Sequence, residues 1–170
     1  MTYYLDNGGL ISVANGNLKV SDSLPPYTYT ISQDEYKNFY LKKIEYLEVP
    51  RRVYGDSIKL KDRILNTFSK RNDSLGVLLL GTKGSGKTLL SKLISIEARQ
   101  KGIPTIVINQ PYTGDNFNTF IQNIDTECVI IFDEFEKVYD REHQKHVLTL
   151  LDGVYNTKNF LLLPQMINIV

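Results

Sequence analysis

Apolar residues along this chain gather in two kinds of pattern, short continuous runs and longer stretches in which they recur at helical spacing. Short continuous runs are typical of strands that are buried on both faces of a parallel sheet. We predict such strands at 76–80, 105–108, 128–132 and 160–163. Helical spacing predicts helices at 60–68, 89–98, 116–124 and 142–151. Because strands alternate with helices, we expect a three-layer α/β fold in which helices cover both faces of a parallel sheet.

The beginning of the chain follows a different pattern. Asn15-Gly16 is a dipeptide favoured in two-residue hairpin turns, and it separates the apolar runs 10–13 and 18–20. Residues 6–9 are a second turn signal. We therefore expect 1–31 to be a β-rich N-terminal element with a small hairpin, which has too few apolar residues to form a core of its own.

A helix is predicted after this element. Ser32 and Glu35 have the spacing of a capping box, in which a serine opens a helix and a glutamate three residues later binds back to its start. The residues that follow at helical spacing are Tyr36, Phe39, Tyr40, Ile44 and Leu47. Pro50 ends the pattern, because proline cannot continue a helix. We expect 32–53 to be a connecting amphipathic helix whose aromatic stripe faces the protein.

A glycine-rich segment joins the strand predicted at 76–80 to the helix that follows. It consists of Gly81, Thr82, Lys83, Gly84, Ser85, Gly86, Lys87 and Thr88, and it matches the phosphate-binding pattern G-x-x-x-x-G-K-[ST]. In this pattern backbone N–H groups surround a phosphate, and the start of the helix adds its dipole. We expect Lys87 to reach the β- and γ-phosphates of a nucleotide and Thr88 to bind Mg²⁺. The flanking strand and helix are the context that so short a pattern needs.

Two acidic residues, Asp133 and Glu134, follow the apolar run at 128–132. Ligands of open α/β sheets bind beyond the carboxyl ends of the strands, where both this pair and the glycine-rich segment are expected. Asp133 is suited to hold Mg²⁺, directly or through its water, and Glu134 to polarise the water that attacks a γ-phosphate. A solvated acidic strand end is the alternative, and the glycine-rich segment upstream makes it the weaker interpretation.

Charge and cysteine content narrow the choice of function. The formal net charge is +1, which by itself does not indicate binding to nucleic acid or to a membrane surface. Charge is uneven, since 36–71 carries ten Lys/Arg against four Asp/Glu, and 112–142 carries two against eight. One explanation of this uneven charge is two separate faces that are exposed to solvent. The other is that oppositely charged faces of neighbouring subunits meet in a ring. Cys128 is the only cysteine and lies in an apolar run, so we expect a core residue and neither a disulfide nor a cysteine-based metal site within the chain.

The N-terminus and the lengths of the apolar runs bear on where the protein is located. The first residues lack the basic start and apolar run of a signal peptide. No apolar run approaches the ~18 residues of a membrane span. We therefore expect a soluble, intracellular and cytoplasmic protein with no membrane partner.

The two motifs together give the chain a resemblance to the AAA+ ATPases, from about Tyr54 to Leu163. Gly81–Thr88 corresponds to the Walker A motif of that family, and Val129–Glu134 corresponds to its Walker B motif. The resemblance implies that Tyr54 borders the adenine together with two neighbours, Gly55 and Asp56. It also implies ATP and Mg²⁺ as cofactors, a parallel sheet ordered 5-1-4-3-2 and a homo-oligomeric ring. The segment 148–154 is similar to the stretch that precedes the fourth core strand in many members.

A pore loop is a further family feature, which follows the second core strand in translocating AAA+ rings. It has an aromatic, an apolar and a glycine residue, and this chain has Tyr112, Thr113 and Gly114 there. The resemblance implies that Tyr112 grips an extended polypeptide while Gly114 lets the loop move. Thr113 departs from the usual aliphatic residue. An ordinary Pro-Tyr-Thr-Gly turn explains these residues equally well.

The last residues depart from the family pattern. After the fourth strand, AAA+ proteins carry a polar sensor residue, a fifth strand, an arginine finger and a helical lid, whereas this sequence ends with Pro164–Val170. We expect an ATPase core at 54–163 that is incomplete at its C-terminal end, and an aberrant tail at 164–170. The degenerate codons of 163–170 permit a sensor-like segment in the neighbouring reading frame, so our hypothesis is that the tail results from a frameshift.

One main functional prediction and two alternatives follow. The main prediction is an ATPase that couples Mg-ATP hydrolysis to the remodelling of a polypeptide or nucleic-acid partner, with Lys87 and Glu134 as catalytic residues. One alternative is a hydrolysis-deficient nucleotide-binding fragment or assembly partner, because an arginine finger contributes ~10³–10⁵ in rate. The other is a DNA-associated ATPase similar to helicase loaders, which the basic segment 36–71 favours.

Overall fold

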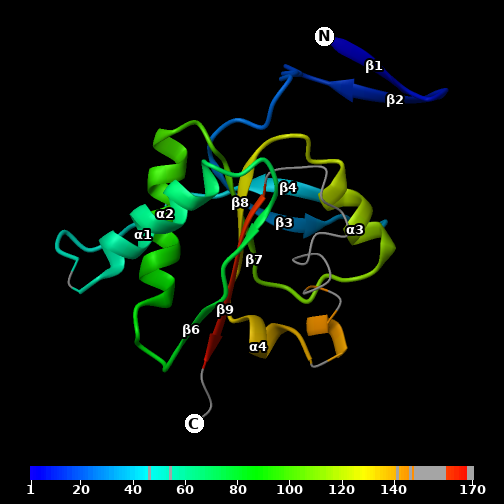
Figure 1. The fold of residues 1–170 in the computed structure, drawn as a ribbon. Helices are drawn as coiled ribbons and strands as arrows, with labels where there is room; N and C mark the ends of the chain where they lie inside the picture. The colour runs from blue at the N-terminus through cyan, green and yellow to red at the C-terminus, as the bar shows by residue number, and fades with distance from the viewer. Residues whose placement is uncertain (46, 54, 141, 146, 148–159, 168–170) are drawn as a thin grey trace.

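The computed structural model describes residues 1–45, 47–53, 55–140, 142–145, 147 and 160–167 (Figure 1). Its elements in chain order are β1 (Thr2–Asn7), β2 (Leu10–Asn15), β3 (Thr28–Gln33), β4 (Phe39–Lys43), α1 (Ser57–Phe68), β5 (Leu75–Gly76), β6 (Leu79–Gly81), α2 (Lys87–Gln100), β7 (Thr105–Ile108), α3 (Asp115–Gln122), β8 (Cys128–Phe132), α4 (Phe135–Val138) and β9 (Phe160–Ile167). No helix in these residues has both the length and the apolar character needed to cross a lipid bilayer.

Most of the strands form one sheet in the order β4-β3-β7-β8-β9-β5, and β6 also pairs with β9. All neighbouring pairs are parallel except β3 with β4. In the order 5-1-4-3-2 that the resemblance implies, β7, β8 and β9 hold places 2, 3 and 4, and β5 with β6 holds place 1. The expected α/β fold with a parallel sheet is therefore confirmed, and β3 and β4 extend the sheet beyond place 2.

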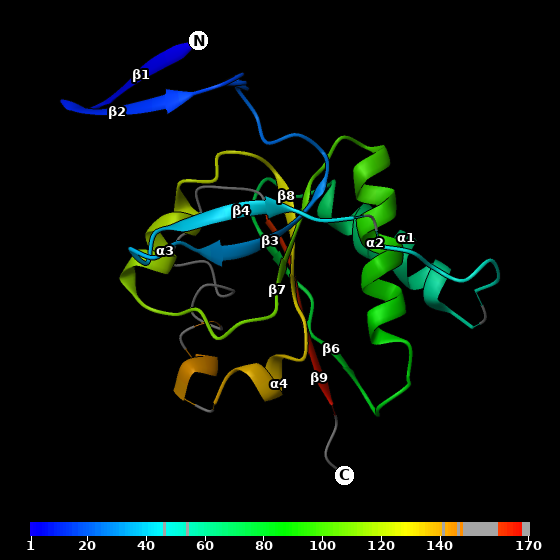
Figure 2. The same cartoon turned by 180° about the vertical axis from the view of Figure 1, so that it is seen from behind.

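Helices lie on both faces of this sheet (Figures 1 and 2). Along β8, Cys128, Ile130 and Phe132 join one core cluster, whereas Val129 and Ile131 join another on the opposite face. The first cluster also takes in residues of α3, α4 and β3, and the second takes in residues of α1 and α2. All five residues of β8 are buried, which explains its continuous apolar sequence. Cys128 is thus the core residue that was expected, and burial raises the pKa of its thiol.

The N-terminal hairpin turns at the second of the two predicted turn signals, residues 6–9, and not at Asn15-Gly16. Asn7 pairs with Leu10, so the loop between β1 and β2 is Gly8-Gly9. Both glycines have positive φ, 62° and 90°, which residues with a Cβ rarely adopt and which tight hairpin turns require. Residues 18–20 form no strand. The prediction of a hairpin is confirmed, but the predicted turn at Asn15-Gly16 and its second strand are wrong.

The connecting helix predicted at 32–53 is wrong, because this part of the chain forms the end of β3 and all of β4. The capping-box pattern failed because the carboxylate of Asp34 organises the backbone in place of Ser32. It accepts hydrogen bonds from the backbone N–H groups of Tyr36 at 2.9 Å and Asn38 at 2.8 Å. These bonds close a turn between two strands, which is the use of aspartate side chains that competes with helix formation.

Tertiary contacts explain why β3 is a strand. Tyr29 and Ile31 are buried in the first core cluster, and β3 pairs in parallel with β7. Such burial and pairing outweigh local helix propensity, which is worth a few tenths of a kcal/mol per residue. The expected boundary after residue 31 therefore falls inside a strand, and residues 28–43 belong to the main sheet.

The last strand, β9, runs through the first part of the expected tail. It pairs with β5 at 161–162 and with β6 at 165–167, in one continuous register. The break between β5 and β6 falls opposite Leu163 and Pro164, and a proline has no N–H to donate to a ladder. This explains why the strand predicted at 76–80 is divided in two. β9 therefore extends through 164–167 of the expected tail, and 168–170 lie outside the described residues.

The remaining predicted elements agree with the structure where it describes them. β7 and β8 have the predicted bounds, and α1, α2 and α3 begin and end within three residues of the predicted positions. Residues 142–145 are helical. The rest of the helix predicted to residue 151, apart from 147, and the whole segment 148–154 lie outside the described residues.

Candidate nucleotide-binding site

Both sequence motifs lie at the same edge of the sheet. The Walker A segment follows β6, which ends at Gly81, and the acidic pair follows β8, which ends at Phe132. Both strands run parallel to their shared neighbour β9, so their carboxyl ends point the same way. Figure 1 shows the loop before α2 and the helix α4 at this end of the molecule, away from the β1–β2 hairpin.

The Walker A segment turns sharply into α2. Gly86, the residue before the helix, has a φ of 89°, which lies in the left-handed region that favours glycine. The ammonium of Lys87 donates to the carbonyl oxygens of Gly81 at 2.7 Å and Thr82 at 2.9 Å, and to Ser85 Oγ at 3.4 Å. An ammonium has three N–H donors. The donors of Lys87 are therefore all directed at the loop itself.

Close approach explains the first glycine of the segment. A Cβ on Gly81 would lie 2.4 Å from Ser85 Oγ and 3.1 Å from Ser85 Cβ. Both distances are shorter than ordinary contacts between side-chain atoms, so a larger residue at 81 would push Ser85 away. Glycine at position 81 therefore allows the start of the loop to approach Ser85 closely.

Asp133 continues the direction of β8 and is partly buried. Its backbone N–H donates to the carbonyl oxygen of Ile108 at 3.0 Å, which ties it to the end of β7. Burial, followed by the neighbouring charge of Glu134, raises the pKa of the Asp133 carboxyl. A cation that approaches such a carboxylate stabilises its ionised form, because the cation offsets the cost of burying the negative charge.

Glu134 leaves the strand in a left-handed backbone conformation, with φ 47° and ψ 42°. Its carboxylate forms an ion pair with the ammonium of Lys137, and the hydrogen bond from this pair raises the pKa of Lys137. The side chain of Glu134 is 59% exposed, so solvent screens the pair and its contribution to stability is small. The pair orients the carboxylate more than it stabilises the fold.

One cavity of about 200 Å³ brings the two motifs together. It is lined by Lys83, Gly84, Lys87, Thr88, Asp133, Glu134, Glu136 and Lys137, and we call it the motif cavity. Three ammonium groups and three carboxylates therefore surround one space. Such a lining offers positive charge for phosphates and oxygen ligands for a metal ion.

Glu136 and Lys137 also line this cavity, and neither sequence motif predicts them. They lie on α4, the single turn of helix that follows the acidic pair. The charged run from 133 to 137, interrupted only by Phe135, was the available signal. Phe135 is fully buried, so it fixes α4 against the core and directs its charged neighbours to the edge of the sheet.

Two of the residues expected beside the adenine, Gly55 and Asp56, do not line the motif cavity. Gly55 has a φ of 80°, and Asp56 forms an exposed ion pair with Lys59 at 3.4 Å. The helix α1 starts just after them, and a Cβ on Gly86 would lie 3.9 Å from Ser57 Oγ. Tyr54, the third residue of this prediction, lies outside the described residues.

The structure places the expected pore-loop tyrosine against the core. The ring of Tyr112 is 5.2 Å from that of Phe39 and 5.9 Å from that of Phe117, measured between centroids. Its hydroxyl donates to the carbonyl oxygen of Ile31 at 3.4 Å. Thr113 is partly buried and Gly114, with φ 91°, precedes α3. These contacts favour the interpretation of 112–114 as a structural turn.

The donor atoms of the motif cavity suit Mg²⁺ better than a metal bound by protein alone. Within the described residues, no group of three or more His, Cys, Asp or Glu side chains could hold a metal ion. Mg²⁺ is usually held by one or two carboxylates together with phosphates and water. Asp133 and Thr88 supply oxygen atoms of that kind, and Glu136 Oε2 is buried with no hydrogen-bond partner in the described part of the chain. The residues present therefore fit Mg²⁺ that enters with a nucleotide.

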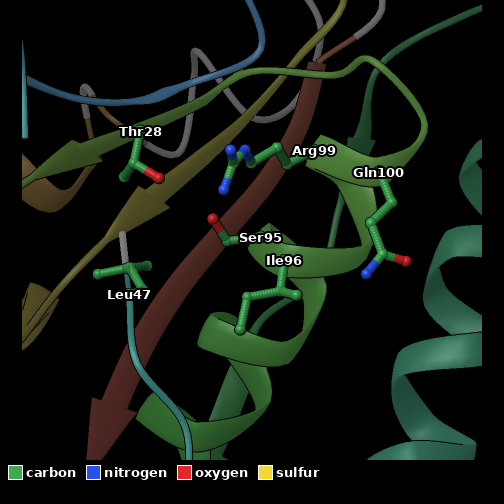
Figure 3. A pocket seen from close by; sticks show the side chains of 6 residues that line it. All are labelled: Thr28, Leu47, Ser95, Ile96, Arg99 and Gln100. Atoms are coloured by element: carbon green, nitrogen blue, oxygen red, sulfur yellow. The ribbon is translucent and has the colours of Figure 1, made fainter. Parts of the chain in front are cut away.

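A second cavity, of about 340 Å³, lies at the opposite end of α2. Thr28, Ser95 and Arg99 face its interior (Figure 3), and Leu47, Ile96 and Gln100 complete its lining. The rise of a helix, about 1.5 Å per residue, separates Arg99 from Lys87 by roughly 18 Å. This cavity contains none of the predicted site residues and is distinct from the motif cavity.

Comparison with known families identifies the group to which the chain belongs. A family model described as "ATPase family associated with various cellular activities (AAA)" matches residues 77–164, more than half of the chain. The match takes in both motifs, and the members of this family are P-loop proteins that bind ATP and generally use magnesium. No curated protein matches the chain. The chain is therefore a member of the AAA family, an ATPase of the AAA+ type.

Proposed function

We propose that the motif cavity binds Mg-ATP and hydrolyses it to ADP and phosphate. The observation that carries this proposal is the single cavity in which Lys87 and Thr88 of the Walker A segment meet Asp133 and Glu134. Each motif alone has a simpler explanation, a glycine-rich turn or a solvated strand end. Their meeting in one cavity supports a shared ligand that carries both phosphates and a metal ion.

The role of Lys87 is to exchange its present partners for phosphate. Its ammonium donates to two loop carbonyls and to Ser85 Oγ, and a bound β- or γ-phosphate would replace at least one of these acceptors. The exchange is favourable because a hydrogen bond between two charged groups is stronger than one to a neutral carbonyl. The backbone N–H groups at the start of α2 add donors and a favourable dipole.

Asp133 and Thr88 would hold Mg²⁺, whose positive charge offsets the charge of the phosphates. Glu134 would accept a hydrogen bond from the attacking water and orient it toward the γ-phosphate. In this proposal the ion pair with Lys137 keeps the Glu134 carboxylate at the cavity, where one oxygen serves the ammonium and the other faces the water. Gly55 and Asp56, beside the Walker A segment, would border the adenine.

At the level of the assembly, we propose a three-layer AAA+ core that acts in a homo-oligomeric ring. ATP turnover would then drive the remodelling of a polypeptide or nucleic-acid partner. The uneven charge of 36–71 and 112–142 supports contacts between unlike faces of neighbouring subunits. A cytoplasmic location belongs to the same proposal.

Nucleotide binding and hydrolysis by the full chain test the proposal, with Lys87→Ala and Glu134→Gln as variants. Loss of the Lys87 ammonium should weaken Mg-ATP binding about 10- to 100-fold, because one charge-assisted hydrogen bond is worth about 1.5–3 kcal/mol. Glu134→Gln should retain binding and lower the hydrolysis rate ~10²-fold or more. Calorimetry measures the first effect and release of inorganic phosphate measures the second.

Matched controls lie at the far ends of the same elements. Lys101 follows the C-terminal end of α2, and Glu127 precedes the N-terminal end of β8. The control variants are Lys101→Ala and Glu127→Gln. Both should bind and hydrolyse ATP like the wild type. Equal rates in the wild type and in Glu134→Gln would contradict the role of Glu134. Binding without phosphate release would favour the hydrolysis-deficient alternative, and binding of DNA with a steep salt dependence would favour the DNA-associated one.

A further inference from the structure

Glu136, which lies at the motif cavity, has one carboxylate oxygen that is buried. Glu136 lines that cavity, and among the described residues its Oε2 atom has no hydrogen-bond partner. Leaving a buried polar atom unsatisfied costs about 1–3 kcal/mol, and more when the group is charged. Such an atom in a folded protein calls for an explanation, of which a bound ion or its water is one.

The backbone around Glu136 prevents the side chain from escaping into solvent by a rigid-body shift of α4. Phe135 is fully buried and Tyr139 is 1% exposed, and both belong to the first core cluster. The Tyr139 hydroxyl also donates to the carbonyl oxygen of Gln110 at 3.1 Å. Residues on either side of Glu136 are thus anchored, so the fold maintains its carboxylate at the cavity.

The neighbouring cations have other partners. Lys137 forms its ion pair with Glu134. Lys87 donates to the Walker A loop. Lys83, the third lysine of the cavity lining, is exposed to solvent. The partner that Glu136 lacks is therefore best supplied by a ligand that enters the cavity.

We propose that Glu136 is a positioning residue that accepts a hydrogen bond from a water molecule of Mg-ATP. This inference rests on the proposed function, because it assigns a further residue to the same site. Mg²⁺ binds its water tightly and keeps several water molecules when it enters a protein site. Each of those molecules needs acceptors for its hydrogen atoms, and the carboxylate of Glu136, which lines the cavity, has one oxygen without a hydrogen-bond partner.

The test measures the Mg²⁺ concentration that gives half-maximal binding of N-methylanthraniloyl-ATP by the full chain. Glu136→Gln and Glu136→Ala should raise this concentration about tenfold or more, the usual effect of losing a group that orients a metal's ligands. In EDTA, where the nucleotide carries no metal, both variants should bind it as well as the wild type does. Glu127→Gln makes the same charge change at the other end of β8. It should change neither the half-maximal Mg²⁺ concentration nor the binding of nucleotide in EDTA.

Thermal unfolding adds a readout that a merely structural role would not produce. Without nucleotide, Glu136→Gln should raise the unfolding midpoint, because the amide is neutral and burying it without a partner costs less than burying a carboxylate oxygen. Addition of Mg-ATP should raise the unfolding midpoint of this variant by less than it raises that of the wild type. If Glu136 only supported the fold, its replacement would instead lower the unfolding midpoint both with and without Mg-ATP.

Each outcome has a defined consequence. An unchanged Mg²⁺ requirement in both Glu136 variants overturns the inference and leaves the proposed function intact. Equal loss of binding with Mg²⁺ and in EDTA overturns it too, since Glu136 would then act through the lysines or the fold. Failure of the wild type to bind Mg-ATP at any Mg²⁺ concentration overturns the proposed function, and the inference with it.

Discussion

The backbone of Glu134 shows how a single residue is adapted to the site. Its φ of 47° is one of two positive values for non-glycine residues in the described part of the chain. Residues with a Cβ pay roughly 1–2 kcal/mol for the left-handed region. Strain of this kind persists where the surrounding structure imposes it, and it is concentrated at functional sites. Here it turns the chain from β8 into α4 while the carboxylate of Glu134 remains at the motif cavity.

The strain at Glu134 leads to a stability prediction. Glu134→Gly should raise the free energy of unfolding by about 1 kcal/mol, because relief of the left-handed strain exceeds the added flexibility of the unfolded chain. Urea denaturation measures this free energy. Glu134→Gln keeps the Cβ and serves as the control, which should show no such gain. A lower stability of the glycine variant would mean that the ion pair with Lys137 outweighs the strain.

At the scale of elements, the turn between β3 and β4 decides how the sheet is extended. Asp34 accepts two backbone hydrogen bonds and also one from the Asn38 side-chain amide at 3.0 Å. The bonds from Asn38, first its side chain and then its backbone, hold the pKa of the Asp34 carboxyl below its ordinary value. A carboxyl with a lowered pKa favours the folded state while it is ionised. The turn is therefore an acid-sensitive support for the edge of the sheet.

Replacement of Asp34 should reveal this dependence on pH. Asp34→Ala should lower the unfolding midpoint at neutral pH, where the wild-type carboxylate is ionised. The contribution of Asp34 is present above its ordinary pKa of 3.8 and disappears as the pH falls through the lower folded value. The gap between the wild type and the variant should therefore narrow in acid. Thermal unfolding across this pH range measures the gap, and a gap that stays constant would show that the ionised carboxylate does not support the turn.

At the scale of the whole molecule, the β1–β2 hairpin stands apart from the ATPase core. Figures 1 and 2 both show it beyond the end of the sheet that lies away from α4. Neither core cluster contains a residue from the described N-terminal stretch 1–23. Residues 21–23 line a pocket together with residues of the body, and the N–H of Leu24 donates to Thr126 Oγ1 at 3.0 Å. An isolated two-stranded hairpin adds little to the stability of a fold.

Removal of the hairpin should leave the core intact. A chain that lacks residues 1–20 should unfold at nearly the same temperature as the full chain, because no core residue is lost. It should also bind Mg-ATP with the same affinity, since the motif cavity lies at the other end of the sheet. Calorimetric unfolding and nucleotide titration measure the two effects. A marked drop in the unfolding temperature would show that the hairpin supports the core.

The sequence alone determined the parts of the fold whose signals are local. The apolar runs of β7 and β8 reflect burial on both faces, and the helical spacing of α1 and α2 reflects contact with one face of a sheet. The Walker A segment and Asp133-Glu134 could be found because their residue types and their flanking elements are both written in the sequence. Membership of the AAA family follows from those same residues.

Only the tertiary structure decided which distant segments meet. Ser32 and Glu35 fit a helix start, yet pairing with β7 and burial of Tyr29 and Ile31 made this segment a strand. Likewise β9 continues past Pro164 because β6 pairs with it there. The place of Glu136 at the motif cavity depends on the anchoring of α4, which no local pattern records. Local propensities are worth a few tenths of a kcal/mol per residue, whereas burial of a large apolar side chain is worth about 1.5–3 kcal/mol, so contacts between distant segments prevail where the two disagree.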